Sequence, residues 1–142
     1  MIRITDKVKE EVDAEEGKEA LLDMLGGAPR KEIRTIALFG DVDEEKGGDI
    51  CMGLLMLTDF SDKEAPYEPI TFYLSTYGGS ADEMFSIYDM MSITKAKCEI
   101  KTVGLGKIMS AGTLLLAAGT KGKRKIGKHC RVMIHAVAAG SS

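Results

Sequence analysis

Two residues in the last third of this chain, Ser110 and His135, are of the types that can together carry out acyl transfer. Ser110 opens an almost wholly apolar run that extends to Gly119, which predicts a buried helix beginning at the serine. A helix N-terminus favours negative charge, so a serine alkoxide and the oxyanion it creates would be stabilised there. The alternative is that the Ser110 hydroxyl only caps the helix, since serine is among the preferred capping residues.

His135 follows the apolar residues Val132-Met133-Ile134 and is one of only two histidines in the chain. Its unperturbed pKa lies close to neutral pH, which makes it the natural general base for a serine. The alternative is a core histidine whose ring is satisfied by a backbone carbonyl. The second histidine, His129, lies in a polar turn, and we expect it to be exposed.

The glycine pair Gly78-Gly79 is a third candidate for chemistry. It follows a segment of strand character and precedes a helical pattern, so it could be only a tight turn that needs positive φ. It could also let backbone amides approach a substrate carbonyl at the carboxyl end of a sheet, where open α/β folds bind their ligands. The sequence around it matches neither the P-loop nor the dinucleotide-binding pattern.

The elements that would position these residues alternate along the chain. β-Branched and aromatic runs predict strands over 33–39, 70–75, 98–105, 124–127 and 131–137. Helical spacing of apolar residues predicts helices over 48–59, 81–94 and 110–118. The 70–75 segment lacks polar alternation, which is typical of a parallel strand buried on both faces. The alternation predicts an α/β fold.

The N-terminal 30 residues differ in composition from the rest. Within 1–28, eight Asp or Glu residues stand against four Lys or Arg residues, and a short helix is predicted over 15–25. A helix of that length is marginal by itself. We expect an appendage over 1–30 that is mobile or ordered by a partner, followed by one domain over 31–142.

Composition limits the classes of function. The chain has 142 residues, 44% of them hydrophobic, and a net charge of -3, which is typical of a soluble domain and argues against nucleic-acid binding. The basic cluster over 121–128 is expected to be a solvated loop. No run is long enough to span a membrane, and no signal peptide is visible. Three widely spaced cysteines predict mostly buried, reduced thiols of a cytoplasmic protein. They lack the close pairs typical of zinc sites, and we expect no metal and no cofactor.

Read together, these segments closely resemble the ClpP family of self-compartmentalising serine peptidases. The resemblance spans about residues 33–140 and is carried by Gly40-Asp41-Val42-Asp43, Gly78-Gly79-Ser80, Ser86-Ile87-Tyr88-Asp89, Met109-Ser110-Ala111-Gly112, Lys121-Gly122-Lys123-Arg124 and Arg131-Val132-Met133-Ile134-His135. It implies a ClpP/crotonase-like α/β fold of repeated β-β-α units, with 31–142 as the peptidase head domain. It also implies a homo-oligomer, a heptameric ring usually stacked in pairs, which degrades unfolded polypeptides delivered by an AAA+ unfoldase of the Clp class.

The resemblance also implies roles for individual residues. Ser110 corresponds to the nucleophile and His135 to its general base. The amides of Gly79 and Ala111 correspond to the oxyanion donors. Gly78, Gly79 and Ser80 would bind the peptide as an added strand.

Two departures from the family pattern bear on activity. Tyr77 stands where the family commonly has proline. The family's triad aspartate lies beyond a handle helix that follows the histidine, and no acidic residue follows His135 in this sequence. We therefore expect a chain that lacks the handle and the C-terminal part, and loss of the orienting carboxylate lowers turnover by about 10⁴-fold. Two alternatives stay open: a non-catalytic ring subunit, and a crotonase-type acyl-CoA enzyme, which needs no serine–histidine pair.

Overall fold

The computed structural model describes residues 4–24, 26, 32–61 and 64–137. Judged by its internal contacts, the chain divides into two units, Met1–Ile33 and Arg34–Ser142. The predicted division after residue 30 lies slightly earlier, and the mobility of the first residues stays a prediction. None of the helices in the described ranges has the length and apolar character needed to cross a lipid bilayer.

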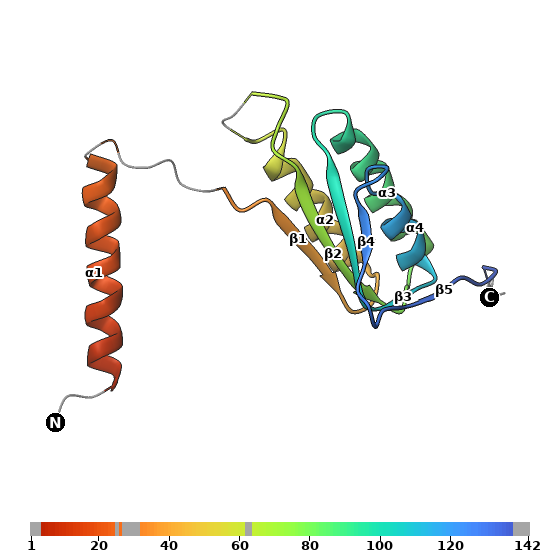
Figure 1. The fold of residues 1–142 in the computed structure, drawn as a ribbon, viewed down its shortest axis with the longest axis horizontal. Coiled ribbons are helices and arrows are strands. Elements are labelled where there is room, and N and C mark those ends of the chain that lie inside the picture. Colours follow the sequence, from red (N-terminus) through yellow and green to blue (C-terminus); the bar gives the residue numbers. More distant parts are fainter. Residues whose placement is uncertain (1–3, 25, 27–31, 62–63, 138–142) are drawn as a thin grey trace. The chain divides into compact units, whose positions relative to one another are not determined.

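Helix α1 (Ile4–Met24) lies in the first unit (Figure 1). It begins well before the predicted helix over 15–25, because its first half is rich in Glu and Lys, which have a high helix propensity. Apolar residues recur too sparsely there to signal a helix by periodicity. The side chains from 13 to 24 are all exposed.

The second unit alternates strands and helices. Its elements are β1 (Thr35–Phe39), α2 (Glu44–Leu57), β2 (Ile70–Thr76), α3 (Ala81–Lys95), β3 (Ile100–Met109), α4 (Ala111–Ala117), β4 (Arg124–Ile126) and β5 (Arg131–Met133). All paired strands are parallel, in the order β1-β2-β3-β4, and β5 pairs with a later part of β3 than β4 does. The predicted α/β class is confirmed. Within the described residues, one strand precedes each of α2, α3 and α4.

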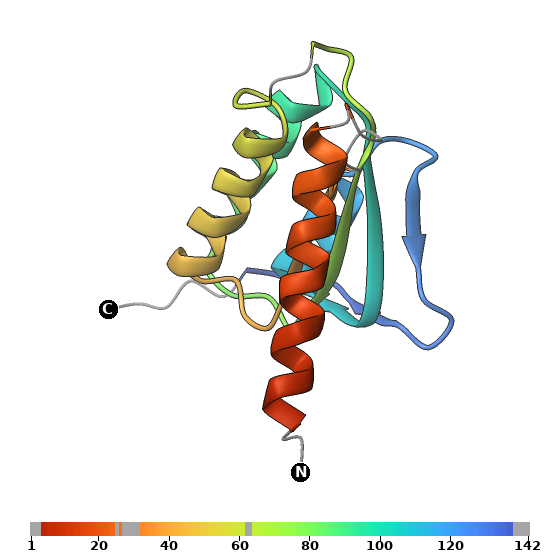
Figure 2. The ribbon, with the colours of Figure 1, turned by 90° about the vertical axis from the view of Figure 1, so that its left-hand side faces the viewer.

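Helices α2, α3 and α4 lie on the same face of the sheet (Figure 2). Right-handed crossovers that all step in one direction along the sheet place their helices on one side. On β2, Ile70, Phe72 and Leu74 point into the core with no exposed surface, whereas the alternate residues are half-buried. The prediction that this strand is buried on both faces is therefore wrong, because helices of this unit cover only one face.

Several element boundaries differ from the predictions. Helix α2 begins at residue 44 rather than 48, since the Asp43 carboxylate accepts a hydrogen bond from the Lys46 amide at 2.9 Å and caps the helix ahead of its glycines. Strand β3 continues past Gly106 to Met109, where the predicted strand ended at 105. Strand β5 ends at Met133, so His135 lies in the irregular segment beyond it rather than on a strand.

Candidate active site

Ser110 stands at the junction between β3 and α4 with φ 53° and ψ −121°. It is the only non-glycine residue with positive φ in the described part of the chain. A backbone of this kind costs about 1–3 kcal/mol and persists only where its surroundings enforce it. The Ser110 hydroxyl makes no capping hydrogen bond to α4, so the capping alternative is wrong. The strained turn instead presents the hydroxyl outside the helix, as nucleophile turns between strand and helix do.

His135 lies beside this serine. Its Nε2 atom is 2.8 Å from Ser110 Oγ, and its side chain is exposed, so the core-histidine alternative is wrong. The parallel pairing of β5 with β3 makes the approach possible: Met133 is in register with Met109, and its carbonyl accepts a hydrogen bond from the Ser110 amide at 2.9 Å. A serine that donates to Nε2 requires the ring proton on Nδ1.

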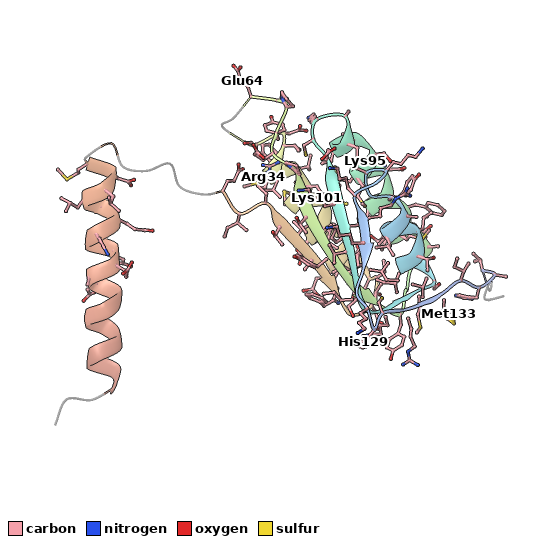
Figure 3. The ribbon with its side chains drawn as sticks, in the orientation of Figure 1. Arg34, Glu64, Lys95, Lys101, His129 and Met133 are labelled. Atoms are coloured by element: carbon pink, nitrogen blue, oxygen red, sulfur yellow. The ribbon has the colours of Figure 1, made fainter. Side chains whose placement is uncertain are left out.

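The orienting carboxylate of a triad is not found among the described residues. No ion pair in those ranges joins His135 to an aspartate or glutamate. The serine–histidine pair is thus a dyad in this part of the chain. His129 is exposed, as predicted. Figure 3 shows it at the same end of the sheet as Met133, opposite the end that carries Arg34 and Lys95.

The Gly78-Gly79 turn lies against Ser110. Both glycines have positive φ, 104° and 152°. A Cβ on Gly78 would lie 2.7 Å from Ser110 Cβ and 3.2 Å from the Ala111 amide nitrogen, and one on Gly79 would overlap the backbone of Val42. Only glycine therefore fits at either position. The turn is anchored to the segment between β1 and α2, since the Val42 amide donates to the Gly78 carbonyl at 2.8 Å.

Gly79 and Ala111 both line the cavity that Ser110 lines. Ala111 is the first residue of α4, so its amide has no acceptor within the helix. Two amides that converge beside a serine can donate to an oxyanion formed on a carbonyl.

A cavity of about 430 Å³ opens beside Ser110 and His135. Apart from the site residues its walls are mostly apolar: Ala81, Met84, Thr113, Leu114, Ile134 and Val137. Met84 is partly buried and packs against the hydrophobic core, and it also lines this cavity. Its position four residues after Ser80, in the first turn of α3, was the signal that it faces the carboxyl end of the sheet.

None of the three cysteines lines the cavity beside Ser110. All three cysteines are free, but only Cys98 is buried, whereas Cys51 and Cys130 are half-buried. Burial raises the pKa of the Cys98 and Cys51 thiols, and in Cys51 the charge of Glu83 adds to this effect. The described residues contain no group of three or more His, Cys, Asp or Glu side chains able to hold a metal ion.

Comparison with known proteins identifies the family. The family model for Clp protease matches residues 23–142. The chain belongs to the Clp protease family. It is 40% identical over 107 residues to "ATP-dependent Clp protease proteolytic subunit 2" of Nocardia farcinica, covering 75% of this chain and 50% of that protein. It is also 40% identical over 107 residues to subunit 1 of Corynebacterium jeikeium, covering 75% and 54%.

Solved Clp structures share the fold. The ClpP catalytic domain from Plasmodium falciparum superposes with a TM-score of 0.64 at 31% identity, over 72% of this chain and 55% of that one. A ClpP1 point mutant from Listeria monocytogenes gives 0.67 at 29% identity, over 85% and 61%. This Clp family chain therefore spans about half the length of the curated relatives it matches.

Proposed function

We propose that this Clp family chain is the catalytic core of a serine endopeptidase that hydrolyses unfolded polypeptides through an acyl-enzyme. The observation that carries the proposal is the 2.8 Å contact between Ser110 Oγ and His135 Nε2 beside the Gly78-Gly79 turn. A hydrogen-bonded nucleophile and base next to convergent amides is the arrangement that acyl transfer needs.

In the proposed mechanism Ser110 Oγ attacks the peptide carbonyl while His135 Nε2 accepts its proton. The amides of Gly79 and Ala111 donate to the oxyanion, where each such donor is worth about 10²–10³ in rate. His135 then returns the proton to the leaving amine, and the acyl-enzyme forms. Water, deprotonated by His135, hydrolyses the ester and frees Ser110.

The substrate would lie along the turn as an added strand, held by the backbone of Gly78, Gly79 and Ser80. The side chain on the acyl side of the scissile bond would enter the cavity beside Ser110. Because Met84 and Leu114 line that cavity, we propose a preference for apolar side chains there. No metal or cofactor takes part in this mechanism.

We also propose that the whole protein is a cytoplasmic homo-oligomeric ring of seven subunits, fed with unfolded chains by an AAA+ unfoldase. Large apolar side chains exposed on the two packed helices α2 and α3 support assembly, because apolar surface gathered on neighbouring elements marks protein–protein interfaces: Met52, Met56, Phe85 and Ile93 are each 54–55% exposed. Membership of the Clp protease family favours a peptidase over the crotonase-type acyl-CoA enzyme.

The test is covalent labelling with a fluorophosphonate probe. We expect the chain to be labelled, Ser110→Ala to abolish labelling, and His135→Ala to slow it by at least 10²-fold. Ser92→Ala is the matched control, since that hydroxyl is exposed and bonds only to the Tyr88 carbonyl of its own helix. Labelling that persists in Ser110→Ala would refute the nucleophile.

A second candidate is a non-catalytic ring subunit, favoured by the lack of an ion pair between His135 and any carboxylate in the described ranges. A folded chain that is not labelled, yet assembles into a ring by light scattering, would establish this candidate instead.

A further inference from the structure

A cation–π contact lies directly beside the candidate site. Tyr77 is the residue before Gly78, and its side chain is 63% exposed. The Lys107 ammonium lies 4.8 Å from the centroid of the Tyr77 ring, a distance at which the ring face attracts a cation. The contact joins the exit of β2 to β3 across the sheet.

The β2–β3 pairing is irregular at this point. The ladder is regular up to Leu74, which pairs with Gly104, and then shifts register, so that a single pair, Thr76 with Ile108, follows the bulge. Beyond it the Gly78 amide donates to the Thr76 hydroxyl at 2.9 Å. The turn thus leaves β3 after one ladder pair, and its two glycines have little conformational restraint of their own. The Tyr77–Lys107 contact is an additional tie between the turn and β3.

Lys107 also connects to the histidine side of the site. It is in register with Arg131 at the start of β5, the strand whose Met133 carbonyl accepts from the Ser110 amide. His135 follows two residues after that strand. One lysine, three residues before the serine, therefore contacts the segment that leads to the Gly79 amide and pairs with the strand that leads to His135.

We infer that Tyr77 and Lys107 are positioning residues, whose contact holds the Gly78-Gly79 turn at the distance from Ser110 that oxyanion stabilisation requires. The inference rests on the proposed function. It predicts an effect on the chemical step rather than on probe binding, because neither side chain lines the cavity beside Ser110.

The first test measures fluorophosphonate labelling of the full chain at several probe concentrations. We expect Lys107→Met, which keeps the stem and removes the charge, to lower the maximal rate about two- to five-fold and leave the half-saturating concentration unchanged. Lys107→Arg and Tyr77→Phe should keep the wild-type rate. Tyr77→Leu should match Lys107→Met, and the double variant should lose no more than either. The inference would be overturned if the single variants keep the wild-type labelling rate, or if the fold-loss in the double variant equals the product of the losses in Tyr77→Leu and Lys107→Met.

The second test needs no activity. Amide hydrogen exchange at Ser80, which donates to the Val42 carbonyl at 2.8 Å, should accelerate two- to five-fold in Lys107→Met relative to wild type, while the Leu54 amide in α2 is unaffected. Lys101→Met, an exposed lysine on the same strand, is the control and should change neither readout. If the wild-type chain is not labelled, the proposed function fails, and hydrogen exchange alone tests the positioning role. An exchange rate at Ser80 that is unchanged in Lys107→Met would then refute that role.

Discussion

The two ends of the sheet each carry a cation beside a tyrosine ring, but they use it differently. At the amino end Arg34 lies 5.7 Å from the Tyr67 ring and also donates to the carbonyls of Glu68 and Leu57, at 2.6 and 3.1 Å. There the cation satisfies one loop carbonyl and the carbonyl of the last residue of α2, and it joins three segments of backbone. At the carboxyl end the Lys107 cation contacts Tyr77, and the nearby Ala111 amide has no acceptor within its helix.

The difference follows from what each end must do. At the amino end, a hydrogen bond from a half-buried donor to a backbone carbonyl stabilises the fold. A charged donor makes a stronger hydrogen bond than a neutral one. Amides at the carboxyl end are useful only if no protein acceptor occupies them before a substrate does. Substitution of Arg34 should therefore change stability, and substitution in the Gly78-Gly79 turn should change reactivity.

The largest expected effect is at the turn. Gly79→Ala should lower the fluorophosphonate labelling rate by at least 10²-fold, because the added Cβ overlaps the Val42 backbone and moves the amide beside Ser110. Gly48→Ala is the control: this glycine lies in α2 with open space around it, so alanine should stabilise the fold by about 0.5–1 kcal/mol and leave labelling unchanged. A wild-type labelling rate in Gly79→Ala would show that the turn does not contribute to the reaction of Ser110.

Next in size is a stability effect at the opposite end. Arg34→Met should lower the free energy of unfolding by about 2–3 kcal/mol in urea titrations, since the carbonyls of Glu68 and Leu57 lose a charged donor. The labelling rate of the folded fraction should stay at the wild-type value. Lys123→Met, which removes an exposed ion pair with Glu99 of 3.8 Å, should change stability by less than about 1 kcal/mol. A reduced labelling rate in folded Arg34→Met would contradict the division of roles between the two ends.

A smaller effect is expected in substrate choice. Met84→Ala enlarges the cavity beside Ser110, so peptide substrates with an aromatic residue on the acyl side should gain about three- to ten-fold over those with alanine. The measurement is the ratio of kcat/KM for a matched pair of peptides. Met52→Ala, an exposed methionine of α2, should leave that ratio unchanged. An unaltered ratio in Met84→Ala would show that the cavity does not receive this side chain.

The smallest effect concerns pH. Asp43 caps α2 directly after Val42, and its hydrogen bonds to Lys46 lower the pKa of its carboxyl below the ordinary value of 3.8. A carboxyl whose folded pKa is depressed stabilises the fold above its unfolded pKa, and that contribution is lost as pH falls through the folded pKa. Asp43→Asn keeps an acceptor for the cap, so its stability difference from wild type should shrink in acid below pH 3.8 and stay constant near neutrality. If the stability difference between Asp43→Asn and wild type does not depend on pH, the ion pair with Lys46 does not stabilise the fold.

Much of the fold could be predicted from the chain alone, because the signals are local. Each core segment of the sheet carries its own apolar and β-branched run, and the glycines of the 78–79 turn mark its end. The errors occurred where local signals compete. The glycines at 47 and 48 hid the start of α2, and Gly106 hid the continuation of β3, because a glycine is read as a break unless a cap or a neighbouring strand holds the backbone.

By itself the sequence determined which residue types were available for acyl transfer, a serine at a helix start, a histidine and a glycine pair, and its resemblance to a family assigned them roles. Only the tertiary structure decided between the alternatives for Ser110 and His135. A hydroxyl that caps a helix and one that meets a histidine 25 positions later have the same local sequence. The parallel pairing of β5 with β3 makes the difference, and long-range pairing is not encoded in the residues next to the serine.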